Sequence, residues 1–308
     1  MSRIGWCLAI ASILIAEPAL AWRAQGHMAT GLIAYDRLAA RDPAAIAAIE
    51  ALMALHPDHA RFESALAGLE GAERERRMFA LMARWPDDIR ATRWNHTHWH
   101  HQLRVMVGWK AFRGPRVGEA DFAFRHNLKI LRNSQAGPAE RAIALCWIFH
   151  VVGDMHQPLH AGHRQDKHFP LTDFAGSKGW VRRSADAAPE TFHHFWDTPA
   201  DRPGDELAGA VAIAAAIESD PPAVDPPSGD PVADYRTWVA ESERIAAEKA
   251  YPDAMDAEGT SREKAGTLTP DYVEHARIIG EKRIGEAGER LADLLAAVFP
   301  AGSGLSRR

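Results

Sequence analysis

Two histidine–aspartate pairs with identical spacing stand out in the sequence. His150 and Asp154 are four residues apart, and so are His193 and Asp197. Residues four apart lie on one face of a helix, so each pair can present an imidazole and a carboxylate to the same point. Imidazole combined with carboxylate suits zinc, and a catalytic zinc site keeps a position open for water. The pairs therefore predict zinc binding.

The segment around the first pair is apolar on nearly every side, from Ile143 to Val152. A carboxylate buried there costs several kcal/mol unless it is paired or ligates a metal. One such pair is explained equally well by a hydrogen-bonded pair in the core. Repetition of the pair, together with His160 shortly after Asp154, favours metal binding over packing.

Two further groups of candidate residues lie upstream. They are Trp85-Pro86-Asp87-Asp88-Ile89-Arg90 and Trp99-His100-His101. Each is a weak signal on its own, because a Trp-Asp turn is commonly structural and a histidine in a polar loop is more often solvated than bound to a metal.

Taken in order, these residues resemble the S1/P1 nuclease family, which shares a helical fold with bacterial zinc-dependent phospholipases C. The central match is the most specific, and the others gain weight from their order. The matches are Trp22-Arg-Ala-Gln-Gly-His27, Trp85-Pro-Asp87-Asp-Ile-Arg90, Trp99-His100-His101, His150-Val-Val-Gly-Asp154-Met-His156-Gln-Pro-Leu-His160 and Phe192-His193-His-Phe-Trp196-Asp197.

The resemblance implies three zinc ions per chain and a ligand set for each. It places one zinc on Asp87, His100, His150 and Asp154, and a second on His160, His193 and Asp197. It places the third on His27, on Asp154 as a bridge, and on the amine and carbonyl of Trp22. It also implies catalytic roles for Asp87, Arg90 and Asp154, with the Arg90 guanidinium holding phosphate. His156 has no metal role in this scheme.

The resemblance further implies hydrolysis of single-stranded DNA or RNA to 5′-nucleotides, with 3′-nucleotides as additional substrates. The net charge of −5 disfavours a protein that grips a long duplex through many phosphates. Two alternatives stay open: a zinc-dependent phospholipase C and a non-catalytic secreted zinc-binding protein. We expect no stable membrane association and no obligate protein partner.

Two departures from the family pattern affect substrate contacts. His101 stands where the family usually has an aromatic residue, at a position that the resemblance places near the substrate base. The family's Asp-x-Gly-Gly-Asn stretch is not recognisable within residues 163–179.

The amino-terminal residues have the pattern of a secretory signal peptide. Arg3 precedes an apolar run from Trp6 to Ala16, and Ala19-Leu20-Ala21 follows. The run is shorter than the ~20 residues that a membrane-spanning helix needs. Cleavage after Ala21 would expose the Trp22 amine, which the implied third zinc site requires. We therefore expect a secreted or periplasmic protein.

The remaining chain, residues 22–308, is expected to form one all-α domain of the phospholipase C/P1 nuclease type. Helical periodicity dominates and strand-like alternation is nearly absent. A proline-rich stretch at 220–231 predicts a surface loop. Proline in the first turn predicts three helix starts, at Pro43, Pro138 and Pro270. The helices are expected at 27–41, 44–55, 72–84, 119–133, 138–152, 206–218, 235–250 and 270–298.

Overall fold

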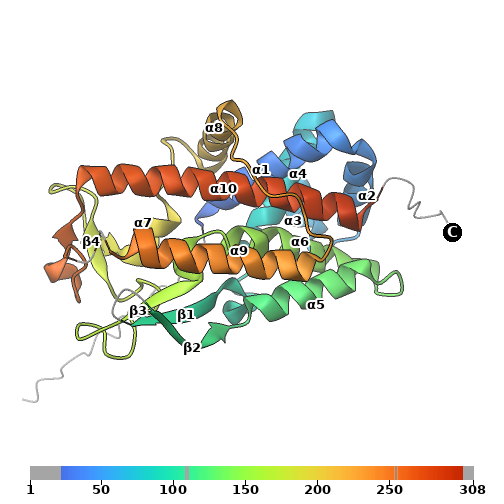
Figure 1. Ribbon diagram of the computed structural model, residues 1–308. Helices are drawn as coiled ribbons and strands as arrows, with labels where there is room; N and C mark the ends of the chain where they lie inside the picture. The colour runs from blue at the N-terminus through green and yellow to red at the C-terminus, as the bar shows by residue number, and fades with distance from the viewer. Residues whose placement is uncertain (1–21, 108–110, 253, 255, 301–308) are drawn as a thin grey trace, which may run out of the picture.

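Figure 1 shows the computed structural model, which describes residues 22–107, 111–252, 254 and 256–300. The fold is all-α, as predicted, since helices dominate the described residues and the strands are short. The predicted signal peptide at 1–21 and the end of the predicted domain at 301–308 lie outside the described residues. None of the helices in the described residues is both long and apolar enough to cross a membrane.

All eight predicted helices are present, several with different ends. The helices are α1 (Ala24–Arg41), α2 (Pro43–Met53), α3 (His59–Ala65), α4 (Gly71–Asp88), α5 (Ala120–Arg132), α6 (Pro138–Asp154), α7 (Phe192–Asp197), α8 (Glu206–Ser219), α9 (Pro231–Ile245) and α10 (Pro270–Val298). The short helices α3 and α7 were not among the predicted helices. A π turn at Ala246–Ala250 continues α9, and single 3₁₀ turns lie at Thr97–His100, Pro158–His160 and Arg262–Lys264.

The predicted helix starts at proline are confirmed, two of them with a side-chain cap. Asp42 accepts a hydrogen bond from the Ala45 amide at the start of α2, and Thr269 accepts one from Tyr272 at the start of α10. Helix α9 begins at Pro231, earlier than expected, because Asp230 caps it by accepting from the next amides. Local capping chemistry therefore sets these boundaries.

Helix α6 is the central element of the body. Its residues from Ala144 to Asp154 are all buried, as their apolar character predicts. It packs against α1, α2, α4, α5 and α10. In Figure 1, α9 and α10 cross the front of the molecule and α5 lies along its lower edge. His150 and Asp154 are thus carried by the buried last turns of this helix.

Two small sheets occupy stretches where the sequence predicted little or no strand. One has the order β2-β1-β3 and the other β5-β4-β6. The strands are β1 (Gln102–Val107), β2 (Ala111–Gly118), β3 (Gly162–Gln165), β4 (Trp180–Arg182), β5 (Glu190–Thr191) and β6 (Gly266–Thr267). In the first sheet, β1 runs parallel to β3 with Val105 opposite His163. This pairing joins the segment after His100 to the segment after His160.

Candidate metal centre

The last turn of α6 places Asp154 among three histidines. Its Oδ1 lies 3.3 Å from His27 Nε2 on α1, and its Oδ2 lies 3.2 Å from His100 Nδ1 and 3.3 Å from His150 Nε2. The Asp154 side chain is fully buried. The two oxygens of this carboxylate therefore face different histidines.

Asp87, at the end of α4, completes this cluster. Its Oδ1 lies 3.8 Å from His150 Nε2 and 4.0 Å from His100 Nδ1, and its Oδ2 lies 3.9 Å from His27 Nε2. We call the five residues His27, Asp87, His100, His150 and Asp154 the Asp154 group. Two overlapping sets within the group, each with ligand atoms within 4.8 Å of one another, could hold a metal ion.

A second cluster forms around Asp197 at the end of α7. His193 Nε2 lies 3.4 Å from Asp197 Oδ2, and His160 Nε2 lies 3.9 Å from Asp197 Oδ1. The three side chains are buried and could also hold a metal ion. We call them the Asp197 group. His160 Nδ1 lies 3.9 Å from Asp154 Oδ1, so the two groups are adjacent.

Trp22 lies next to the Asp154 group. Its indole Nε1 donates to the carbonyl of Gly153 at 3.0 Å, and its side chain is fully buried. A Cβ added at Gly153 would lie 2.9 Å from His27 Nδ1. Trp22, His27 and the end of α6 therefore pack closely, and the residue predicted to begin the mature chain lies against the carboxylate-bearing turn.

Backbone carbonyls orient three of the imidazoles. His150 Nδ1 lies 2.8 Å from the Ala83 carbonyl, His160 Nδ1 2.6 Å from that of His100, and His193 Nδ1 2.6 Å from that of Ala175. Donation from Nδ1 leaves each Nε2 as the atom that faces its cluster. The ring orientations therefore suit metal ligation.

The His100 carbonyl contributes to the Asp197 group while the His100 ring belongs to the Asp154 group. Gln157, just before Pro158-Leu159, also links the groups. Its side-chain amide donates to Asp197 Oδ1 at 2.7 Å, and its backbone amide donates to the Asp154 carbonyl at 3.0 Å. Hydrogen bonds through His100 and Gln157 therefore connect the two groups.

The protonation states of the buried groups agree with metal binding. Burial lowers the pKa of His27, His100 and His160 well below the usual range, which keeps their rings neutral and able to ligate. Burial also raises the pKa of Asp154 well above its usual range, and the Asp87 carboxylate raises it further. A cation at this point would offset that cost.

Unpartnered buried atoms test whether the residues fit a metal. Both nitrogens of His27, both carboxylate oxygens of Asp154 and the Nε2 atoms of His100 and His160 have no hydrogen-bond partner among the described residues. Buried polar atoms are rarely left in this state unless a water or an ion satisfies them. Neutral imidazoles and carboxylates at these distances fit zinc.

Arg90 lies one turn beyond Asp87 and donates from Nη2 to Asp87 Oδ1 at 2.5 Å. Its Nε is buried and has no hydrogen-bond partner in the described part of the chain. The guanidinium therefore retains an unused donor beside the Asp154 group, and its planar fork suits a phosphate.

His156 supports the turn after α6. Its Nδ1 lies 2.7 Å from the Val152 carbonyl, and Arg290 Nη1 lies 2.9 Å from its Nε2. Arg283 Nε donates to the His156 carbonyl at 3.1 Å. The side chain is therefore held between the end of α6 and two arginines of α10.

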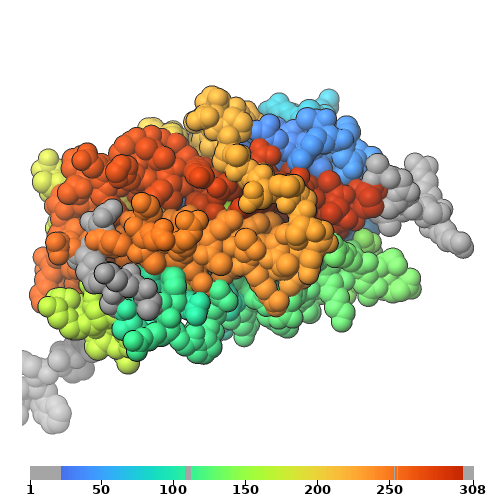
Figure 2. Space-filling view, viewed as in Figure 1, coloured from blue at the N-terminus to red at the C-terminus, as the bar shows by residue number. Residues whose placement is uncertain are grey.

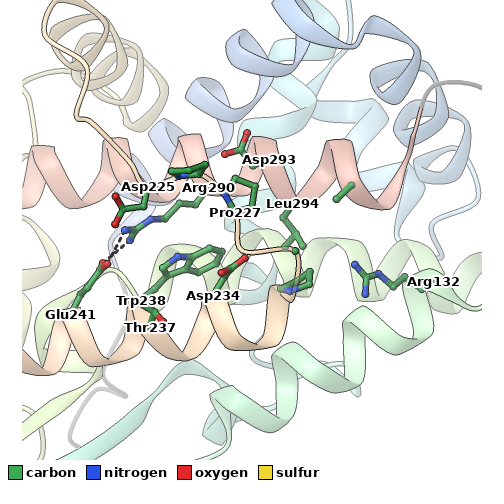
Figure 3. A pocket seen from close by; sticks show the side chains of 14 residues that line it. Arg132, Asp225, Pro227, Asp234, Thr237, Trp238, Glu241, Arg290, Asp293 and Leu294 are labelled. Atoms are coloured by element: carbon green, nitrogen blue, oxygen red, sulfur yellow. Dashed lines mark hydrogen bonds and ion pairs between the residues drawn. The ribbon is translucent and has the colours of Figure 1, made fainter.

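A cavity of about 210 Å³ lies between α9, α10 and the proline-rich loop (Figure 3). Trp238 and Leu294 form part of its wall, and Arg290 ion-pairs with Glu241 beside it. None of the residues predicted to bind metal lines this cavity. The candidate centre is therefore a separate site.

Sequence reasoning missed the turn that orients His193. Phe174, Ala175 and Gly176 have φ values of 52°, 58° and 81°, in the left-handed region that favours glycine. This turn directs the Ala175 carbonyl to His193 Nδ1. The turn lies in the stretch that could not be aligned to the family. Gly176 was the one residue of the turn whose type could have indicated a left-handed conformation.

Comparison with known proteins identifies relatives of the chain. The chain is 26% identical to "Nuclease S1" of Aspergillus oryzae over 197 residues, which cover 57% of this chain and 61% of that protein. It is 27% identical to "Endonuclease 2" of Arabidopsis thaliana over 165 residues, which cover 51% of each. The matches thus span about half to three-fifths of these relatives. The S1/P1 Nuclease family model matches residues 22–300, and the chain belongs to that family.

Proposed function

We propose that this protein is a secreted, zinc-dependent nuclease that hydrolyses single-stranded DNA or RNA to 5′-nucleotides and also acts on 3′-nucleotides. One observation carries the proposal: the Asp154 and Asp197 groups bring eight buried or half-buried histidines and aspartates together in a member of the S1/P1 nuclease family. Such a cluster suits the hydrolysis of a phosphodiester, whose negative charge repels nucleophiles.

We assign three zinc ions to these residues. Asp87, His100, His150 and Asp154 would hold one ion, and the Asp197 group a second. His27, Asp154 and the amine and carbonyl of Trp22 would hold the third. The division of the two Asp154 oxygens between His27 and the His100–His150 pair supports this bridging role. The position of Trp22 against Gly153 supports the role of the chain terminus.

Bound zinc supplies an activated water and positive charge for the attacking and leaving oxygens. The chain's own residues orient the substrate around it. Arg90 donates to a phosphate oxygen through the guanidinium N–H groups that Asp87 leaves unused, and so stabilises the charge that develops during cleavage. Asp87 holds that guanidinium in place through its Oδ1. Residues Asp87, Arg90 and Asp154 are the catalytic residues that we propose.

The cellular location follows from the requirement at Trp22. A free Trp22 amine exists only if the chain is cleaved after Ala21, as the signal-peptide pattern of the sequence predicts. The proposed enzyme therefore acts outside the cytoplasm, in the periplasm or the medium.

Purified protein beginning at Trp22 tests the proposal. We expect zinc by elemental analysis and hydrolysis of single-stranded DNA, single-stranded RNA and 3′-AMP, with 5′-phosphorylated products from the strands. A strong chelator should abolish activity and lower the melting temperature, because ligands bound only by the native state stabilise it.

Two variants serve as a matched pair in this experiment. Asp87→Asn should lose activity, whereas Asp225→Asn, at an exposed aspartate beside the separate cavity, should not. Hydrolysis of phosphatidylcholine with no hydrolysis of nucleic acid would favour a phospholipase. Bound zinc with no turnover of any substrate would favour a non-catalytic zinc protein.

A further inference from the structure

We propose that the outer face of α5 binds the part of a single-stranded substrate that extends beyond the cleaved phosphodiester. This inference rests on the proposed nuclease function and adds a second binding region to it. We call the face the α5 stripe, and its members share exposure and an aromatic or basic side chain. They are Phe122, Arg125, His126, Lys129 and Arg132.

The spacing of these residues places them on one side of the helix. Positions three, four and seven residues apart recur along one face. The members of the α5 stripe are exposed, whereas most of the residues between them are buried against the body. The buried residues are Ala123, Phe124, Asn127, Leu128 and Leu131. The helix is therefore anchored by one face and presents the other to solvent.

Aromatic rings cluster at the end of the stripe nearest the centre. Phe122 is 46% exposed, an unusual degree of exposure for a phenylalanine, and its ring stacks on His126 at 5.3 Å with an angle of 17°. Trp99 lies edge-on to both rings, 6.2 Å from Phe122 and 5.9 Å from His126. The exposed His96 ring also stacks on Trp99, at 3.8 Å. This arrangement offers accessible ring faces for unstacked bases.

The remaining side chains add positive charge to the stripe in a chain of net charge −5, and Arg132 also lines the cavity that contains Asp225 and Asp234. Asp121 pairs with Arg125 at 2.8 Å and also with Arg236. Within the described residues, Lys129 and Arg132 form no ion pair. Glu119 adds one exposed carboxylate at the start of the helix. Unpaired cations beside aromatic rings complement the phosphates and bases of a single strand.

The stripe is continuous with the candidate metal centre. The amides of Glu119 and Ala120 donate to the carbonyls of His98 and His101, so α5 begins beside the metal-binding His100. Figure 1 shows α5 leading from the end of β2 along the lower edge, and in Figure 2 its side chains form part of the surface. From Phe122 to Arg132 the helix rises roughly 15 Å. A strand held at the metal centre can therefore continue along it.

This surface also favours single strands over duplexes. The base faces are covered in a duplex, so the rings of Phe122 and His126 can stack only on bases that are unpaired and splayed apart. A duplex could contact only the cations of the stripe. These neutralise too few phosphates for strong binding to the duplex backbone.

Length-dependent kinetics test the proposal. A dinucleotide reaches only the metal centre, whereas an oligothymidylate of about ten nucleotides is long enough for the stripe as well. For the wild type we expect a lower KM for the longer strand. Phe122→Ala and Lys129→Glu should each raise that KM about tenfold, equivalent to about 1.4 kcal/mol. Hydrolysis of the dinucleotide and the zinc content should not change.

Salt dependence and matched variants separate the stripe from general charge effects. Lys129→Glu should reduce the slope of log affinity against log salt by about 0.7 for each phosphate that Lys129 neutralises in the wild type. Ile278→Ala and Lys282→Glu remove comparable exposed groups from α10 and should leave the KM for the long strand unchanged.

The inference is overturned if the wild type shows no dependence on strand length. It is also overturned if the stripe variants reduce dinucleotide and long-strand hydrolysis equally. If the wild type hydrolyses no nucleic acid, the proposed function fails. Binding of the long strand, measured by fluorescence anisotropy, then tests the stripe separately. About tenfold tighter binding by the wild type than by Phe122→Ala supports the stripe, whereas equal binding overturns it.

Discussion

Replacing Asp154 by asparagine is expected to stabilise the zinc-free protein and destabilise the zinc-bound protein. The substitution keeps the shape of the side chain and removes its charge. The Asp154 oxygens lie 3.2 to 3.3 Å from nitrogens of His27, His100 and His150, so this one change affects both halves of the proposed bridge.

The magnitude for the zinc-free protein follows from the burial of the carboxylate. Both Asp154 oxygens are buried without a hydrogen-bond partner among the described residues. An unsatisfied buried polar group costs about 1–3 kcal/mol, and more when it is charged. An asparagine amide can instead donate to a neighbouring imidazole. We expect the free energy of unfolding of the chelated protein to rise by about 1 kcal/mol.

With zinc bound, the same substitution should lower the free energy of unfolding. Zinc at about 1,000 times its dissociation constant stabilises the native state by about 4.1 kcal/mol, and loss of a bridging ligand removes much of that contribution. Asp87→Asn and Asp197→Asn each affect one ion, so we expect Asp154→Asn to lose the most activity of the three.

Urea unfolding with and without a chelator, zinc per chain and hydrolysis of single-stranded DNA are the measurements. Asp225→Asn is the control. Similar small losses of activity for the Asp154, Asp87 and Asp197 variants, with no change of sign between the two unfolding experiments, would refute the bridging role. The Asp154 side chain would then be part of an ordinary buried histidine–aspartate pair.

Three further predictions concern other residues. A serine added before Trp22 should remove one zinc per chain and sharply lower the rate while the other two sites fill, and equal zinc and equal rates would show that the amine binds nothing. Arg90→Ala should keep its zinc and lower kcat/KM about a hundredfold, and loss of zinc would instead indicate a role in holding Asp87. Burial lowers the pKa of His56 from 6.5 to about 4, so the unfolded chain takes up the proton first and wild-type stability falls as the pH drops through this window. His56→Gln should lose less stability between pH 6.5 and 4 in urea unfolding, and identical pH dependence would contradict this explanation.

The helical architecture was predictable because its signals are local. Asp42-Pro43 and Thr269-Pro270 carry a cap and a preset φ in adjacent residues, and the structure begins helices there. The end of α4 was not predictable in this way. Pro86 should stop the helix near Arg84, yet α4 continues to Asp88. The nearby Ala83 carbonyl lies 2.8 Å from His150 Nδ1, a contact made only after α4 and α6 have packed.

The candidate site also has parts that the local sequence predicts and parts that depend on tertiary packing. Residue types and spacing singled out the His150–Asp154 and His193–Asp197 pairs, because helix geometry converts a spacing of four into proximity. The groups that aim the rings could not be found, because they are backbone carbonyls. The carbonyl of Ala175 has no signature in its own side chain, and the left-handed turn that directs it depends on tertiary packing.

The glycine at position 153 of the central motif is explained by a contact with a residue outside the motif. Neither His150 nor Asp154 needs a glycine between them, yet a methyl group at position 153 would lie 2.9 Å from His27 Nδ1. The motif His150-x-x-Gly153-Asp154 therefore needs a small residue at position 153 because the ring of His27, more than a hundred positions away in the sequence, packs against it. In a survey of related chains, a bulkier residue at this position would identify proteins in which α1 no longer delivers an imidazole, even where the aligned segment ends before α1 is reached.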